Sequence, residues 1–167
     1  MIDVHYEALV PWPLDEVARA LRDLPWTFPR PDGDTAQPGR FHAELRVPVG
    51  ERGSVSHWAT VELGLIERIS GACRVPITIA ASPRFPTFRG SFEGSDVLGD
   101  TVLKLVGECR VPLGIAGQMG DAASGGSMAR ASLRRFFEAA VNALKADLQA
   151  MGPAWRPAAF PESLHDA

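Results

Sequence analysis

The sequence contains only two cysteines, Cys73 and Cys109, which are 36 residues apart. Small secreted domains held together by disulfides carry many more cysteines, and zinc knuckles bring theirs together in close pairs. The chain therefore belongs to neither class. Because free cysteine packs as a small apolar residue, we predict two reduced, buried thiols rather than a disulfide.

Positive charge is not in excess either. The formal net charge is −3 and the isoelectric point is near 5.8. Proteins that bind nucleic acid usually present a basic surface that displaces counterions from phosphates. We therefore expect no nucleic acid among the partners.

Long apolar runs are missing as well. No stretch approaches the roughly 20 apolar residues that a membrane-spanning helix needs. Residues 1–13 also lack the basic region followed by an apolar region that marks a secretory leader. We expect a soluble, cytoplasmic protein that does not enter a membrane.

Motifs of metal, cofactor or nucleophile chemistry are not found. None of the four histidines lies four residues from another, and HExxH and G-x-S-x-G do not occur. The glycine-rich segment 114–120 lacks the Lys-Ser/Thr pair of a P-loop. We predict neither a metal nor a cofactor. His57 is in phase with the inward positions of its segment, so it is the one candidate for an acid or base.

The chain does have enough apolar material for a core. Of its 167 residues, 46% are hydrophobic and 22% are charged, as in ordinary globular domains. This length suits a single domain that folds without a metal or a disulfide. We assign residues 1–153 to that domain and residues 154–167 to a C-terminal tail.

Alternating apolar and polar residues predict several strands. In residues 2–10, Ile2, Val4 and Tyr6 fall on one face, whereas Asp3 and His5 fall on the other. The connecting gaps are too short for crossover helices, so the strands should pair as an antiparallel sheet with one buried face. The same alternation occurs at 41–49, 58–65, 73–81, 88–93 and 103–111, separated by turn-rich gaps such as 50–54 and 93–100.

A short helix and a long loop are expected after the first strand. Apolar residues repeat at helical spacing from Leu14 to Leu24, with Pro13 in the first turn and Pro25 as the stop. Residues 28–40 contain three prolines and two glycines, so we predict a loop without regular structure. Loops of this length often act as lids over a site.

The longest helix is predicted over 127–151, ending at Gly152 and Pro153. At 1.5 Å per residue it would be roughly 37 Å long, which is enough to cross the whole sheet. Its apolar stripe consists of Leu133, Phe136, Phe137, Ala140, Val141, Leu144, Leu148 and Met151.

A local pattern points to a known family. An F-x-G strand at Phe88–Gly90 is followed by an L-x-L-x-G strand at Leu103–Gly107, a proline-leucine-glycine turn and a connector of small residues. With the order of elements, this run resembles the helix-grip fold of the START and polyketide-cyclase-like superfamily, often called SRPBCC. The resemblance implies an α+β fold in which a curved antiparallel sheet wraps around a long C-terminal helix. Two departures stand out: Cys109 replaces an expected aromatic residue, and residues 28–40 replace much of a second short helix.

The resemblance also implies a cavity between the sheet and the C-terminal helix, in which relatives bind lipids, hormones or polyketides. The inward strand positions carry almost no charge, so we expect a small apolar ligand there. The predicted lining consists of His57, Val61, Cys73, Phe88, Phe92, Leu105, Cys109, Phe136, Phe137 and Val141.

Two other functions are open at this point, because a fold does not choose among functions. A cyclase or dehydratase of the polyketide type would use His57 to move protons. A partner-binding module or homodimer would use the outward-facing Trp58, Val102 and Val106. Both a ligand-binding protein and a cyclase would need an entrance to the cavity. Segments 28–40 and 114–126 should form this mouth, since loops with few buried contacts open at low free-energy cost.

Overall fold

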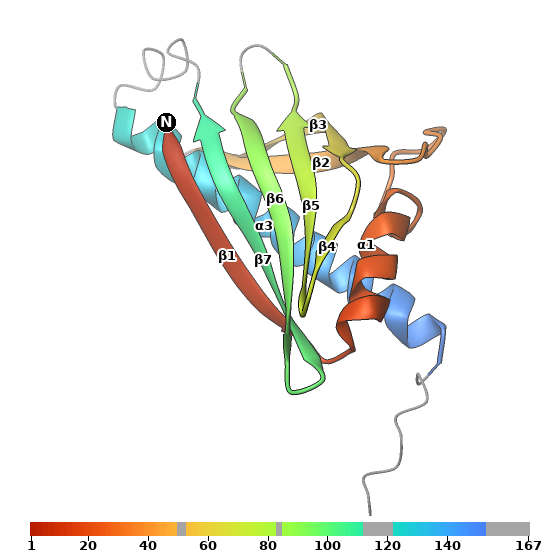
Figure 1. The fold of residues 1–167 in the computed structure, drawn as a ribbon. Helices are drawn as coiled ribbons and strands as arrows, with labels where there is room; N and C mark the ends of the chain where they lie inside the picture. The colour runs from red at the N-terminus through yellow and green to blue at the C-terminus, as the bar shows by residue number, and fades with distance from the viewer. Residues whose placement is uncertain (50–52, 83–84, 112–121, 153–167) are drawn as a thin grey trace, which may run out of the picture.

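A computed structural model describes residues 1–49, 53–82, 85–111 and 122–152 (Figure 1). Seven strands and two helices follow one another along these residues. The elements are β1 (Ile2–Val10), α1 (Leu14–Thr27), β2 (Arg40–Val49), β3 (Gly53–Leu63), β4 (Glu67–Ile69), β5 (Ala72–Ala80), β6 (Thr87–Val97), β7 (Asp100–Arg110) and α3 (Ala122–Ala150).

The strands form one antiparallel sheet in the order β1-β7-β6-β5-β3-β2, and β4 pairs with β5. The sheet curls into a half-barrel, and α3 runs diagonally across its concave side (Figure 1). The two edge strands, β1 and β2, both contact α3, while α1 packs beside the C-terminal half of that helix. The predicted α+β fold, a curved antiparallel sheet around a long C-terminal helix, is confirmed.

The alternation in the sequence decides which face of each strand is buried. In β5, Cys73, Val75, Ile77 and Ile79 are buried, while the residues between them are partly or fully exposed. The inward residues meet the apolar stripe of α3, which is buried from Leu133 to Leu148. Met151, predicted to belong to this stripe, is exposed instead, because α3 ends at Ala150.

Both cysteines are buried and unpaired, as predicted. Burial raises the pKa of the Cys73 thiol, and it raises the pKa of Cys109 to about 11. Both thiols are therefore held in the neutral form near neutral pH.

Two predicted boundaries are wrong for local reasons. Pro25 does not stop α1, which continues to Thr27. A proline in the last turn removes one backbone donor, and the turn is still closed by the Phe28 N–H, which donates to the Leu24 carbonyl at 2.9 Å. The gap predicted at 93–100 is mostly strand, because β6 and β7 are joined by a two-residue turn at Leu98 and Gly99.

Residues 28–39 form a loop without helix or strand, as predicted, and the loop is fixed at both ends. Phe28 is buried against the rings of Phe41 and Phe136, at centroid distances of 5.1 and 5.6 Å. At the other end, the Leu63 N–H donates to the Gly39 carbonyl at 2.7 Å. Gly39 has a φ of +69°, a conformation that favours glycine. A role for the loop as a lid stays a prediction.

No helix among the described residues is long and apolar enough to cross a membrane.

Candidate functional site

The structure brings most of the predicted lining residues together in the core between the sheet and α3. Apart from His57, all of them are buried and belong to one hydrophobic cluster. Phe92 and Phe137, for example, approach to 6.4 Å between ring centroids across the sheet–helix interface. That these side chains line a ligand cavity stays a prediction. Of the predicted mouth segment 114–126, residues 114–121 lie outside the described residues, and residues 122–126 belong to α3, which begins five residues earlier than predicted.

His57 lies near the start of β3 and is only half-buried. Its ring packs against Phe85, with the ring centroids 3.6 Å apart. A catalytic role for His57 stays a prediction.

The three apolar residues that were predicted to face outward are not buried in the core. Trp58 is exposed on β3, and Val102 and Val106 are half-buried on β7. Their use by a partner or in a homodimer stays a prediction.

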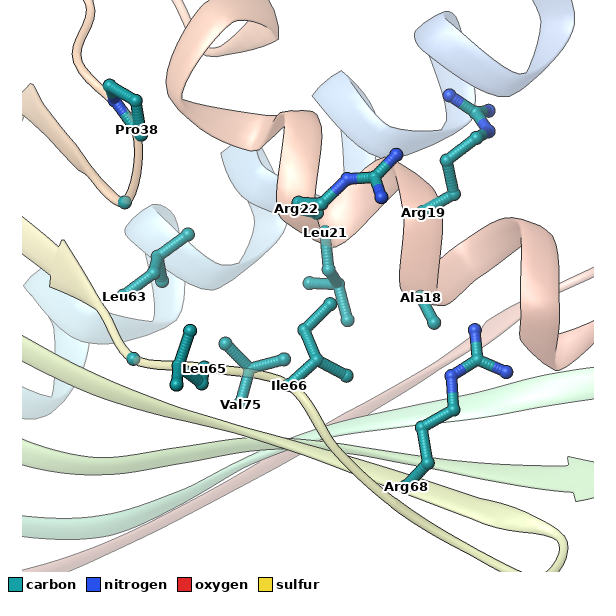
Figure 2. A pocket seen from close by; sticks show the side chains of 12 residues that line it. Ala18, Arg19, Leu21, Arg22, Pro38, Leu63, Leu65, Ile66, Arg68 and Val75 are labelled. Atoms are coloured by element: carbon teal, nitrogen blue, oxygen red, sulfur yellow. The ribbon is translucent and has the colours of Figure 1, made fainter.

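A hollow of about 650 Å³ lies between α1, the end of the 28–39 loop and the bend from β3 to β4 (Figure 2). We call it the α1 groove. Its lining consists of Ala18, Arg19, Leu21, Arg22, Pro38, Gly39, Leu63, Gly64, Leu65, Ile66, Arg68 and Val75.

The floor of the α1 groove is apolar and continuous with the core. Leu21 and Val75 are buried members of the core cluster, and Leu63 and Ile66 pack against that cluster. Figure 2 shows Leu65, Ile66 and Val75 gathered below Leu21 of α1. A ligand in the groove would therefore rest on the surface of the hydrophobic core.

The bend from β3 to β4 holds one leucine away from the core. After β3 ends, the Gly64 N–H donates to the Pro76 carbonyl at 2.8 Å, which ties the bend to β5. A Cβ on Gly64 would lie 3.0–3.2 Å from the Pro76 ring, so glycine lets the chain lie close to this proline. The next residue, Leu65, is 89% exposed at the groove. An exposed leucine beside an apolar floor is a surface that gains from being covered.

Three arginines line the α1 groove above its apolar floor. Arg19 and Arg22 come from α1, and Arg68 rises from β4 toward α1 (Figure 2). Their carboxylate partners, Asp15, Asp23 and Asp147, are not among the lining residues.

A second hollow, of about 560 Å³, lies between the edge strand β1 and α3. There the Tyr6 hydroxyl donates to the Arg130 carbonyl at 2.7 Å, and the Arg134 guanidinium lies over the Tyr6 ring. Burial raises the pKa of Tyr6, although the nearby arginines oppose this. Phe137 and Val141 of the predicted lining reach this hollow, but its other walls are largely polar.

The structure contains one histidine–carboxylate pair that was not predicted from the sequence. His42 Nδ1 lies 3.1 Å from Asp34 Oδ1, which connects β2 to the 28–39 loop. Asp34 Oδ2 is buried and has no hydrogen-bond partner among the described residues. Within the same part of the chain, no group of three or more His, Cys, Asp or Glu side chains is placed to hold a metal ion.

The sequence matches no protein-family model, and no curated protein matches it at a significant level. Similar solved structures do exist. A conserved protein from Geobacillus kaustophilus is 14% identical over 88% of this chain and 97% of that chain, with a TM-score of 0.54. A protein from Thermus thermophilus is 15% identical over 91% of this chain and 100% of that chain, with a TM-score of 0.48.

A protein of the dynemicin biosynthetic locus is also similar, at 18% identity and a TM-score of 0.47. It matches 89% of this chain but only 48% of its own. Of these three structures, the Geobacillus protein is the one with a TM-score above 0.5, and at 14% identity it informs the fold alone. It fits a helix-grip-like arrangement and identifies no activity.

The α1 groove was not predicted from the sequence. Its arginines fall on the polar side of their elements, where charged residues are usually solvated. The alternation predicted at 58–65 places Leu65 in the inward phase with Val61 and Leu63, which is wrong, because β3 ends at Leu63 and Leu65 is exposed. The available signal was Ile66, an apolar residue that breaks the alternation directly after Leu65.

Proposed function

We propose that the protein is an SRPBCC-type binding protein and that it holds a small hydrophobic ligand in the α1 groove. The observation that carries this proposal is the apolar floor beside an exposed Leu65. The volume of about 650 Å³ falls in the range of roughly 300–1,000 Å³ typical of small-molecule sites. The helix-grip-like fold and the F-x-G and L-x-L-x-G strands support the family assignment.

The groove lies where this chain departs from the family pattern. Residues 28–40 replace much of the second short helix expected of similar proteins, and Pro38 and Gly39 of this loop form one wall of the groove. The floor residues Leu21 and Val75 belong to the same core cluster as the predicted sheet–helix lining. A ligand in the groove would therefore lie on the α1 side of this core cluster.

The proposal can be tested with a neutral hydrophobic probe, N-phenyl-1-naphthylamine, whose fluorescence rises in apolar surroundings. We expect saturable binding to the intact protein. Leu65→Ser should weaken it by about tenfold, because the variant removes most of one leucine contact. Leu98→Ser is the matched control, since Leu98 is also fully exposed but lies at the tip of the β6–β7 hairpin.

Hydrogen exchange gives a second, independent readout. Bound probe should slow exchange at backbone amides of residues 63–68, which form the β3–β4 side of the groove. Absence of saturable binding, or equal weakening by Leu65→Ser and Leu98→Ser, would count against the groove as the ligand site. Protection confined to the sheet–α3 interface would instead favour the predicted interior lining.

A further inference from the structure

The α1 groove carries charge of one sign only. Of the described residues that line it, the charged ones are Arg19, Arg22 and Arg68, and none is acidic. An apolar floor flanked by guanidinium groups is complementary to a molecule that is apolar at one end and anionic at the other.

The three arginines differ in how far they are already engaged. Arg19 contacts two carboxylates, Asp23 at 3.1 Å and Asp147 at 3.3 Å, and its side chain is only 26% exposed. It therefore serves mainly to connect α1 to α3.

Arg22 and Arg68 are freer to meet a ligand. Their side chains are 68% and 51% exposed. Each makes one ion pair: Arg22 with its neighbour Asp23 at 3.5 Å, and Arg68 with Asp15 of α1. A guanidinium has five N–H donors, so each group keeps donors that point to solvent. Exposed pairs of this kind contribute little, and a ligand anion that is partly shielded by the groove can compete with them.

We propose that the ligand of the α1 groove is an amphiphilic anion, with a hydrophobic body on the apolar floor and a carboxylate, sulfonate or similar head held by Arg22 and Arg68. The inference rests on the proposed function and adds the chemical class of the ligand. A neutral hydrophobe would use the floor alone, and a cationic head would be repelled by the arginines.

The test compares two probes with the same ring system. N-phenyl-1-naphthylamine is neutral, whereas 8-anilinonaphthalene-1-sulfonate carries an anionic sulfonate. We expect the intact protein to bind the sulfonate about tenfold more tightly, as befits hydrogen bonds to a charged group. The preference should shrink as salt is added, because exposed charges are screened.

The variant Arg22→Gln/Arg68→Gln should lose this preference but still bind the neutral probe, which also shows that the groove is folded. The control Arg89→Gln/Arg110→Gln makes the same change in net charge beside another hollow, at β6 and β7, and should keep the preference. Decanoate and decanol, used as competitors, extend the comparison to a flexible tail.

The outcomes separate the two proposals. If neither probe binds, the proposed function fails and the anionic ligand fails with it. If both probes bind equally well to the intact protein, hydrophobic binding stands and the anionic head is wrong. Equal loss of preference in the two double variants would assign the effect to net charge, which also overturns the inference. Phosphatidylglycerol vesicles test a membrane lipid as the source of the anion. If the protein sediments with these vesicles through Arg22 and Arg68 but shows no preference for the soluble sulfonate, the ligand is a membrane lipid, and the proposal of a free amphiphile is overturned.

Discussion

Gly90 and Gly107 face each other across the β6–β7 pair, and the ring of Phe88 lies over both of them. A Cβ on Gly90 would overlap the Val106 carbonyl oxygen and lie 2.7 Å from Phe88 Cζ. A Cβ on Gly107 would overlap the Arg89 carbonyl oxygen and lie 2.9 Å from the same ring atom. The two strands therefore approach closely only because both residues lack a side chain.

Gly90→Ala and Gly107→Ala should each lower the free energy of unfolding by about 1–3 kcal/mol or more, as overpacking does in rigid cores. The atoms in the way are mostly backbone, which cannot rotate aside. Urea denaturation of the single variants measures the effect. A double variant should cost less than the sum, because one shift of the strands relieves both clashes.

Gly125→Ala is the control for this prediction. An added Cβ there would meet only Val111 Cγ1, at 3.5 Å, and the site lies inside α3. Alanine should raise stability by up to about 1 kcal/mol through its helix propensity. If Gly90→Ala and Gly107→Ala left the free energy of unfolding as high as Gly125→Ala does, the close approach of β6 and β7 would be contradicted.

The glycine pair explains how much of the fold could be predicted from the sequence. The F-x-G and L-x-L-x-G pattern indicated a family hairpin, and its physical reason is the contact of Phe88 with the two glycines. Period-two alternation predicted most of the strands because one face of the sheet is covered by α3. The site could not be predicted in this way, since the α1 groove joins residues 18–22, 38–39 and 63–68, which only the tertiary fold brings together.

Turn geometry at the β6–β7 hairpin gives a second prediction. Leu98 has a φ of +55° and is fully exposed, and Gly99 has a φ of +88°. Two consecutive positive φ values match the two-residue hairpin turn that favours Asn-Gly. A bulky leucine is unfavourable in this conformation.

Leu98→Asn should therefore raise the free energy of unfolding by about 0.5–1 kcal/mol. Thermal and urea denaturation would measure it. The neighbouring Val97→Asn, in the extended β6 strand, should be destabilising because asparagine is a poor strand residue. If both substitutions changed stability in the same direction, the turn geometry would not be the cause.

Arg19 is predicted to couple α1 to α3 energetically. It lies 3.3 Å from Asp147 of α3, and both side chains are mostly buried. A double-mutant cycle with Arg19→Ala and Asp147→Ala should give a coupling energy of about 0.5–1 kcal/mol that falls at high salt. The cycle for Arg22 and Asp23, which are more exposed and 3.5 Å apart, should give a value near zero. A larger coupling for the exposed pair would refute this ranking.

Cys109 should make the protein less stable at alkaline pH. Burial raises the pKa of this thiol from an ordinary value of 9.0 to about 11, against the opposing effect of the N-terminal ammonium group. Above pH 9 the unfolded chain therefore loses the thiol proton while the folded protein keeps it. The contribution of Cys109 to the free energy of unfolding, about 2–3 kcal/mol, is fully present below pH 9 and is lost as the pH rises through 11.

Urea unfolding from pH 8 to 10.5 under reducing conditions would measure how the free energy of unfolding falls with pH, with Cys109→Ala as the reference. Because every other ionisable group is the same in both proteins, the difference between the two curves isolates the thiol. Parallel curves would show that Cys109 is not the group responsible.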